Sequence, residues 1–171
     1  MKTRFLMVVL ALCLSAGCGY RVPGGGDAWV GQQGRTLCVE LFANRTIEPY
    51  LDSVMTEEMA IQLSRSRLVE LVENRKGADL LLGGEVTAFE SRVAAYGAKD
   101  QISEYRASMT VKARLIRRES GAVLWQDEIT RSETYPALDD KSLQQEGESL
   151  AGRVVARRIA EDLHAHLLSA F

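Results

Sequence analysis

The chain has few of the residues on which catalysis and crosslinking usually depend. Its 171 residues include two histidines, His164 and His166, and three cysteines, Cys13, Cys18 and Cys38. Two residues apart on a helix, the histidines point about 200° from each other and cannot share a metal ion, so we expect both to be surface residues. No serine or cysteine stands in a pattern with a histidine and an acid. The sequence therefore predicts a protein that is not an enzyme and that holds no metal and no cofactor.

Adjacent acids occur twice, but neither pair has a catalytic pattern. Glycoside cleavage needs two carboxyl groups that face each other across a substrate, whereas Glu57 and Glu58, like Asp139 and Asp140, are neighbours in sequence. We expect Asp140 to cap the last helix and the glutamates to be solvated.

A strong excess of positive charge is also missing. The net charge is −2, and removal of residues 1–17, which contain Lys2 and Arg4 and no acids, makes it −4. Nucleic-acid binding normally requires a basic surface, so we expect no nucleic-acid partner.

The longest apolar run lies near the start, from Phe5 to Leu14 after Lys2 and Arg4. Ten helical residues rise about 15 Å, roughly half of a bilayer core, so the run is too short to span a membrane. A basic start, an apolar run and small residues indicate a secretory signal peptide, residues 1–17.

The residues Ser15-Ala16-Gly17-Cys18 resemble a lipobox, with Ser15 in place of the usual aliphatic residue. The resemblance implies cleavage before Cys18 and attachment of acyl chains, palmitate among them, to that cysteine. Three such chains would anchor the protein to a membrane essentially permanently. Gly19 resembles the signal for the outer membrane in enteric-type bacteria, which implies a lipid-anchored protein on the periplasmic side of the outer membrane. Cleavage by an ordinary signal peptidase is the alternative.

The rest of the chain divides into a tether and one domain. Residues 18–35 contain Gly24-Gly25-Gly26 and read as a flexible segment, because a phosphate-binding loop would end in Gly-Lys-Ser or Gly-Lys-Thr. Residues 36–171 have the length of one domain with a single core. Cys38 has no partner there for a disulfide.

Apolar spacing predicts seven elements in the order β-α-β-β-β-β-α. A period of two residues marks strands at 36–42, 68–72, 79–92, 104–117 and 122–134, and a helical period marks 48–66 and 140–169. We therefore expect an α+β two-layer sandwich, with two helices on one face of a mainly antiparallel sheet of four to five strands.

Several segments together resemble one known family, LptE, the lipopolysaccharide-assembly outer-membrane lipoproteins. They are Leu37-Cys38-Val39-Glu40-Leu41-Phe42-Ala43-Asn44-Arg45-Thr46, Glu48-Pro49, Ala78-Asp79-Leu80-Leu81-Leu82-Gly83-Gly84, Glu104-Tyr105-Arg106, Val123-Leu124-Trp125 and the start Cys18-Gly19-Tyr20. The resemblance covers nearly the whole chain after residue 17. It implies two helices on a four-stranded sheet, and a protein that plugs the LptD β-barrel, helps it to assemble and loads lipopolysaccharide into the outer leaflet.

The resemblance also implies basic contacts with lipopolysaccharide. Family members have one such residue in the hairpin before the Glu-Tyr strand and one ahead of the last helix, which here corresponds to Lys99 and Lys141. Arg106, Lys112 and Arg114 form a basic row on the exposed face of the same strand and could extend an anion-binding surface. The alternative for this row is cross-strand pairing with Glu85 or Glu128, which would stabilise the sheet by roughly 0.2 to 1 kcal/mol per pair.

Two other functions stay open at this stage. A lipoprotein that regulates peptidoglycan synthesis or secretion would share the anchor and the strand that ends near Asn44-Arg45-Thr46. An enzyme that acts on envelope polymers is the least favoured, because the chain offers no group for it.

Overall fold

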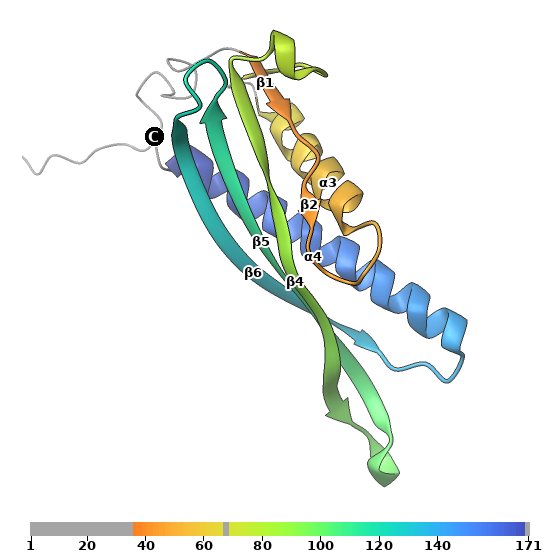
Figure 1. The fold of residues 1–171 in the computed structure, drawn as a ribbon. Helices are drawn as coiled ribbons and strands as arrows, with labels where there is room; N and C mark the ends of the chain where they lie inside the picture. Colours follow the sequence, from red (N-terminus) through yellow and green to blue (C-terminus); the bar gives the residue numbers. More distant parts are fainter. Residues whose placement is uncertain (1–35, 67–68, 170–171) are drawn as a thin grey trace, which may run out of the picture.

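The structure is a computed structural model that describes residues 36–66 and 69–169 (Figure 1). The predicted signal peptide, residues 1–17, and the segment 18–35 with Cys18 lie outside the described residues. The main elements in chain order are β1 (Thr36–Val39), β2 (Ala43–Asn44), α3 (Leu51–Arg65), β3 (Glu70–Leu71), β4 (Leu80–Tyr96), β5 (Ile102–Arg117), β6 (Val123–Pro136) and α4 (Lys141–Ser169). Short 3-10 turns, η1 (Arg75–Gly77) and η2 (Ala98–Asp100), precede and follow β4.

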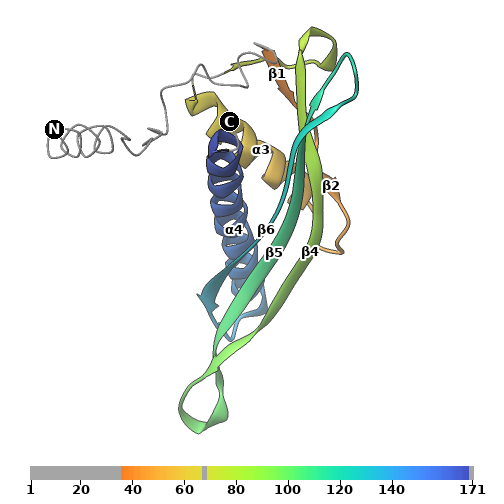
Figure 2. The ribbon, with the colours of Figure 1, turned by 90° about the vertical axis from the view of Figure 1, so that its left-hand side faces the viewer.

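The fold has two layers, with both helices on one side of a long twisted sheet (Figures 1 and 2). The strand order is β3-β1-β4-β5-β6, with β2 also paired to β4. The prediction of an α+β fold is confirmed in this broad form. The expected sheet of four to five mainly antiparallel strands is wrong, because the sheet is mixed and has six strands.

The mixed character comes from α3. This helix carries the chain back from the end of β2 to the end of the sheet where β1 begins. The strands that follow, β3 and β4, therefore run in the same direction as β1 and pair with it in parallel. A helical crossover of this kind gives parallel neighbours, whereas the tight hairpins that follow make β4, β5 and β6 antiparallel. Alternating apolar residues do not distinguish the two cases.

The first predicted strand, residues 36–42, is broken in the structure. Leu37 is buried as expected, but Leu41, which shares its phase, is 66% exposed, and Phe42 is 1% exposed. The change of phase after β1 turns the Phe42 ring into the core, where a phenylalanine buries more apolar area than a leucine.

The main core lies between the sheet and the two helices. On β5, Met109, Val111, Ala113 and Leu115 are buried on the helix side, and the residues between them face the other way. These residues pack with buried side chains of both helices, including Met55, Met59, Val155, Ile159 and Leu163. This alternation leaves the second face of the sheet polar.

The long helix α4 begins at a capped end and is joined to β6 by contacts between polar side chains. Asp140 Oδ1 accepts hydrogen bonds from the backbone N–H groups of Ser142 at 2.8 Å and Leu143 at 3.0 Å, which confirms the predicted cap. Further along, three pairs join the helix to the strand: Arg158–Glu133, Asp162–Arg131 at 2.7 Å and His166–Asp127 at 2.6 Å.

The outer edge of β6 is partly closed by its own side chains. Within the described residues β6 pairs with β5 and with no other strand. Asp127 Oδ1 accepts the backbone N–H of Glu128 at 2.8 Å, and Arg131 Nη1 donates to the carbonyl of Thr130 at 3.0 Å. Two groups of the strand backbone are thereby hydrogen bonded within β6 itself.

Two expectations for single residues need correction. The glutamates Glu57 and Glu58 are not both solvated: Glu57 pairs with Arg153 at 3.3 Å, whereas Glu58 is 7% exposed on the buried side of α3. Of the two histidines, His166 is exposed, but His164 is half-buried and its Nε2 atom finds no hydrogen-bond partner in the described part of the chain. The last turns of α4 still pack on the core through Leu163 and Leu167, so His164 between them is partly covered.

Candidate functional site: the uncovered face of the sheet

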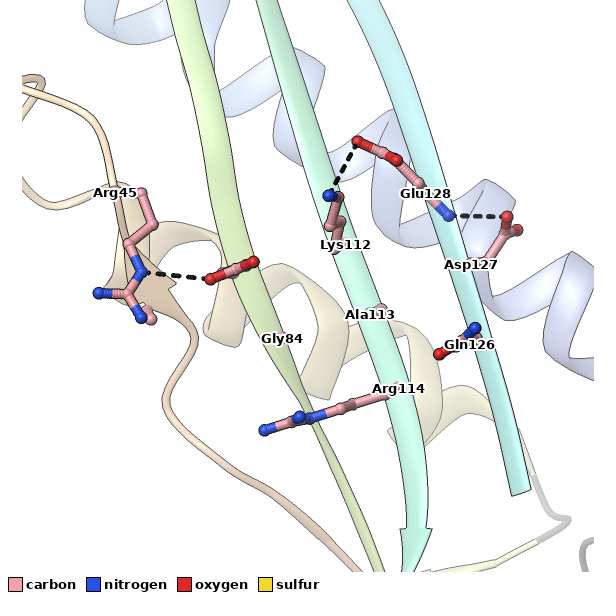
Figure 3. A pocket seen from close by; sticks show the side chains of 10 residues that line it. Arg45, Gly84, Lys112, Ala113, Arg114, Gln126, Asp127 and Glu128 are labelled. Atoms are coloured by element: carbon pink, nitrogen blue, oxygen red, sulfur yellow. Dashed lines mark hydrogen bonds and ion pairs between the residues drawn. The ribbon is translucent and has the colours of Figure 1, made fainter. Parts of the chain in front are cut away.

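The face of the sheet opposite the helices contains a wide polar hollow of about 660 Å³. The hollow is lined by Ala43 and Arg45, by residues 84–85 of β4, by 112–114 of β5 and by 126–128 of β6 (Figure 3). It exists because β5 alternates, so that the apolar residues go to the helices and Lys112 and Arg114 go to this side.

Two ion pairs form a row across the hollow. In the register, Lys112 lies opposite Glu85 on one side and Glu128 on the other. Arg45 Nε is 3.2 Å from Glu85 Oε2, and Lys112 Nζ is 3.8 Å from Glu128 Oε1. All four side chains are at least one-third exposed, so each pair contributes little, on the order of 0 to 1 kcal/mol. The cross-strand pairing considered for this basic row is therefore present at Lys112.

Arg114 differs from Lys112, because it forms no ion pair with any described residue. Its register neighbours are Gly83 on β4 and Gln126 on β6, neither of which carries a charge. Figure 3 shows its side chain extending from β5 toward β4, past Gly84. Asp127 also lines the hollow, but its carboxylate bonds to His166. Arg114 is thus the one cation of the lining that no neighbouring acid neutralises within residues 36–66 and 69–169.

On β4, one of the residues that line the hollow is a glycine, Gly84. A Cβ atom at Gly84 would lie 2.0 Å from the carbonyl oxygen of Lys112 and 2.8 Å from the Phe42 ring. No side chain fits in that space, so glycine is required by the close approach of β5 and of the core phenylalanine.

The structure separates the other predicted contacts from this hollow. Arg106 is exposed on β5 opposite Arg92 and Thr134, nearer the hairpin end, and does not line the hollow. Lys99 lies in η2 at the tip of the β4–β5 hairpin, with a φ of 62°, and Lys141 is the first residue of α4. Lys112 and Arg114 are therefore together, whereas Arg106, Lys99 and Lys141 lie elsewhere.

Sequence reasoning missed Arg45 and Gln126 as parts of this surface. Arg45 lies within the segment that resembles the family, but its position over β4 depends on the parallel pairing of β2. Gln126 becomes a neighbour of Arg114 through the β5–β6 register. The sequence feature that could have identified Arg45 is its position, as a charged residue directly after a strand.

Four titratable groups have shifted pKa values, and each is explained by its surroundings. Burial and then Glu40 raise the pKa of the Cys38 thiol, and burial and then Glu48 raise the pKa of Glu148. Burial also raises the pKa of Tyr135, whose hydroxyl is 2.7 Å from the Ser91 hydroxyl, and it lowers the pKa of His164. These groups lie apart from the hollow and do not form an arrangement of nucleophile and base.

Residues 36–66 and 69–169 contain neither a candidate metal site nor a candidate membrane-spanning helix. No cluster of three or more histidine, cysteine or acidic side chains could hold a metal ion. No helix in this part of the chain is long and apolar enough to cross a membrane.

Comparison with known proteins identifies the family. The family model LptE, described as lipopolysaccharide-assembly, matches residues 34–167. The chain belongs to the LptE family. The members of this family are non-enzymatic lipoproteins associated with lipopolysaccharide assembly. A search of curated sequences finds no match.

Solved structures share the fold of this chain at low sequence identity. A protein from Xanthomonas campestris matches with a TM-score of 0.58 and 15% identity, over 78% of this chain and 84% of that one. The rare lipoprotein B from Shewanella oneidensis matches with a TM-score of 0.51 and 12% identity, over 80% and 96%. A minor lipoprotein from Acinetobacter baumannii matches with a TM-score of 0.52 and 13% identity, over 80% and 92%.

Proposed function

We propose that this LptE-family chain is a lipid-anchored protein on the periplasmic side of the outer membrane. It plugs an LptD-type β-barrel, assists the assembly of that barrel and binds lipopolysaccharide for insertion into the outer leaflet. The family match over residues 34–167 is the observation that carries this proposal.

The uncovered face of the sheet is suited to a water-filled lumen. It presents paired charges, such as Arg45–Glu85 and Lys112–Glu128, rather than an apolar surface. Barrel interiors of the outer membrane are polar, and a face whose charges are mostly paired can lie against such a wall with few uncompensated charges. The backbone of β4 and β5 is hydrogen bonded along the strands, so the plug brings few unsatisfied groups into the barrel.

Basic residues at several places offer contacts with the phosphates of lipopolysaccharide. Lys99 at the hairpin tip and Lys141 at the start of α4 are the two that the family resemblance indicates, and both are exposed. Arg106, Lys112 and Arg114 supply further cations along β5. Charge-assisted hydrogen bonds from such groups are the usual way in which proteins hold phosphate.

The test of this function is purification from the native membrane. Tagged full-length chain, extracted in mild detergent, should bring down one large outer-membrane barrel in a stoichiometric complex. Depletion should raise outer-leaflet phospholipid and detergent sensitivity. Absence of a barrel, together with altered cell-wall crosslinking on depletion, would instead identify a regulator of peptidoglycan synthesis and refute the proposal.

A further inference from the structure

We infer that Tyr135 is a positioning residue, whose side chain fixes the free end of the β4–β5 hairpin against the start of α4. Lys99 lies at the tip of this hairpin, and Lys141 is the first residue of α4. Tyr135 therefore sets how far apart these two lysines are held. That they meet one ligand rests on the proposed function, whereas the contacts of Tyr135 do not depend on it.

The free end of the hairpin extends past the helix layer, where no core supports it (Figures 1 and 2). The structure describes all of residues 92–106, and none of their side chains is buried. β6 pairs with β5 as far as Pro136, and the N–H of Ala137 reaches the carbonyl of Ser103 at 2.9 Å. In this stretch β4 pairs with β5 and with no other described strand.

The pairing of β4 with β5 is irregular close to the tip. The register shifts between Val93 and Ala95 and again between Ala95 and Tyr96. A two-stranded ribbon is only marginally stable by itself, and irregularities of this kind disrupt its ladder locally. The direction of the hairpin end therefore depends on side-chain contacts at the point where it leaves the core.

Tyr135 makes these contacts, because it belongs to the last buried layer before the free end. Its side chain is 7% exposed and packs with Ala107 and Ala151. The ring stacks on Tyr105 of β5, with 5.8 Å between the ring centroids. The hydroxyl is 2.7 Å from the Ser91 hydroxyl of β4. One residue of β6 thus joins both strands of the hairpin.

The same side chain also reaches α4. A Cβ atom at Gly147 would lie 3.3 Å from the Tyr135 ring, so the helix passes close to it. Burial raises the pKa of the Tyr135 hydroxyl, and hydrogen bonds with the side chains of Ser91 and Gln144 oppose that rise. Gln144 Oε1 accepts the backbone N–H of Leu138 at 2.7 Å, so Gln144 also holds the connection between β6 and α4.

The packing of the core does not by itself require the hydroxyl group. A phenylalanine ring would fill the same space, and a buried hydroxyl must be hydrogen bonded to avoid a cost. Apolar packing has no preferred direction, whereas a hydrogen bond holds its partners at a defined distance and angle. The hydroxyl therefore contributes orientation, because Ser91 belongs to the strand that leads to Lys99 and Gln144 shares the first turn of α4 with Lys141.

The first test measures backbone amide order parameters of the hairpin end in full-length protein. In the wild type, residues 95–102 should have the values of a rigid backbone, about 0.85. Tyr135→Phe keeps the ring and removes the hydroxyl, and these values should fall to about 0.6 or lower. Thr130→Val is the matched control, because it removes the 2.8 Å hydroxyl bond between Thr110 of β5 and Thr130 of β6 and should leave them unchanged.

The second test shows whether Tyr135 acts through Lys99. Tyr135→Phe should weaken the binding of purified lipopolysaccharide about twofold to tenfold, the range expected for residues that act together. In Lys99→Gln, which already lacks the cation, the same replacement should have no further effect. A merely structural role would give additive losses in the double variant. Amide spectra establish that each variant is folded before it is titrated.

Three results would overturn the inference. They are unchanged order parameters in Tyr135→Phe, an equal fall in Thr130→Val, and additive losses of affinity for Tyr135→Phe and Lys99→Gln. If wild-type protein binds no lipopolysaccharide, the ligand-binding part of the proposed function fails, and the order parameters alone decide the role of Tyr135.

Discussion

At the scale of single residues, Gly84 and His164 show how packing limits which side chain or which charge state a position can hold. Gly84 lies where β4, β5 and the Phe42 ring meet, and its neighbour Gly83 is buried beside the Glu40 side chain. His164 lies beside Leu37, Leu63, Val69 and Leu167 at the end of α4. Each of these two residues lies at the border of the core. Gly84 leads to a prediction about a substitution, and His164 leads to a prediction about pH.

Replacing Gly84 with alanine should strongly destabilise the fold. The new Cβ would lie 2.0 Å from a backbone oxygen, so β4 or β5 must move and the Phe42 packing must open. We expect a loss of about 1 to 3 kcal/mol in the free energy of unfolding, as for an overpacked core. Urea denaturation measures it. Gly83→Ala, whose Cβ would meet only the Glu40 side chain at 3.3 Å, is the matched control and should cost less.

Stability should fall as the pH drops below about 6.5 because of His164. Burial lowers the pKa of this side chain in the folded state, so the unfolded chain binds the proton first. The contribution of neutral His164 is complete above its unfolded pKa of about 6.5, and it is lost progressively as the pH falls toward the lower folded pKa.

Unfolding free energies between pH 7.5 and pH 5 test this dependence. His164→Gln should reduce the slope, whereas His166→Gln, which leaves the buried histidine in place, should retain the part that His164 causes. An unchanged slope in His164→Gln would show that this histidine does not control the dependence.

At the scale of elements, α4 depends on its start as much as on its apolar stripe. Asp140→Ala removes the acceptor for two backbone N–H groups, at 2.8 and 3.0 Å, and should lower the unfolding free energy by about 0.5 to 2 kcal/mol. Asp139→Ala removes the same charge next to the cap and should have little effect. Thermal denaturation of both variants checks the difference, and equal losses would contradict the capping role.

Sequence periodicity predicted most elements and the antiparallel meander, because burial alternates regularly along β5 from Tyr105 to Leu115. It did not predict the break after Val39, since Leu41 continues the alternation and the Phe42 ring overrides it. Nor did it predict which basic residues share a hollow. The register of β4 shifts between Val86 and Ala88 and again after Val93, so the partner of Arg106 and the place of the hairpin tip with Lys99 depend on irregularities that no spacing reveals.

At the scale of the whole molecule, the family assignment and the predicted anchor lead to a test in cells. If Cys18 carries acyl chains, Cys18→Ser should release the protein from the membrane fraction, because three chains account for its attachment. Mass spectrometry of the wild-type N-terminus should show the added acyl mass. An unmodified thiol at Cys18 in freely released protein would contradict the anchor, whereas the fold of residues 36–169 would be unaffected.

The outer edge of β6 bears on whether identical chains can associate strand to strand. Long bare strand edges invite association between identical chains, and natural proteins protect them. Here Asp127 and Arg131 occupy backbone groups of Glu128 and Thr130. These two bonds reduce the number of free backbone groups through which the edge of β6 could pair with the edge of a second copy of the chain.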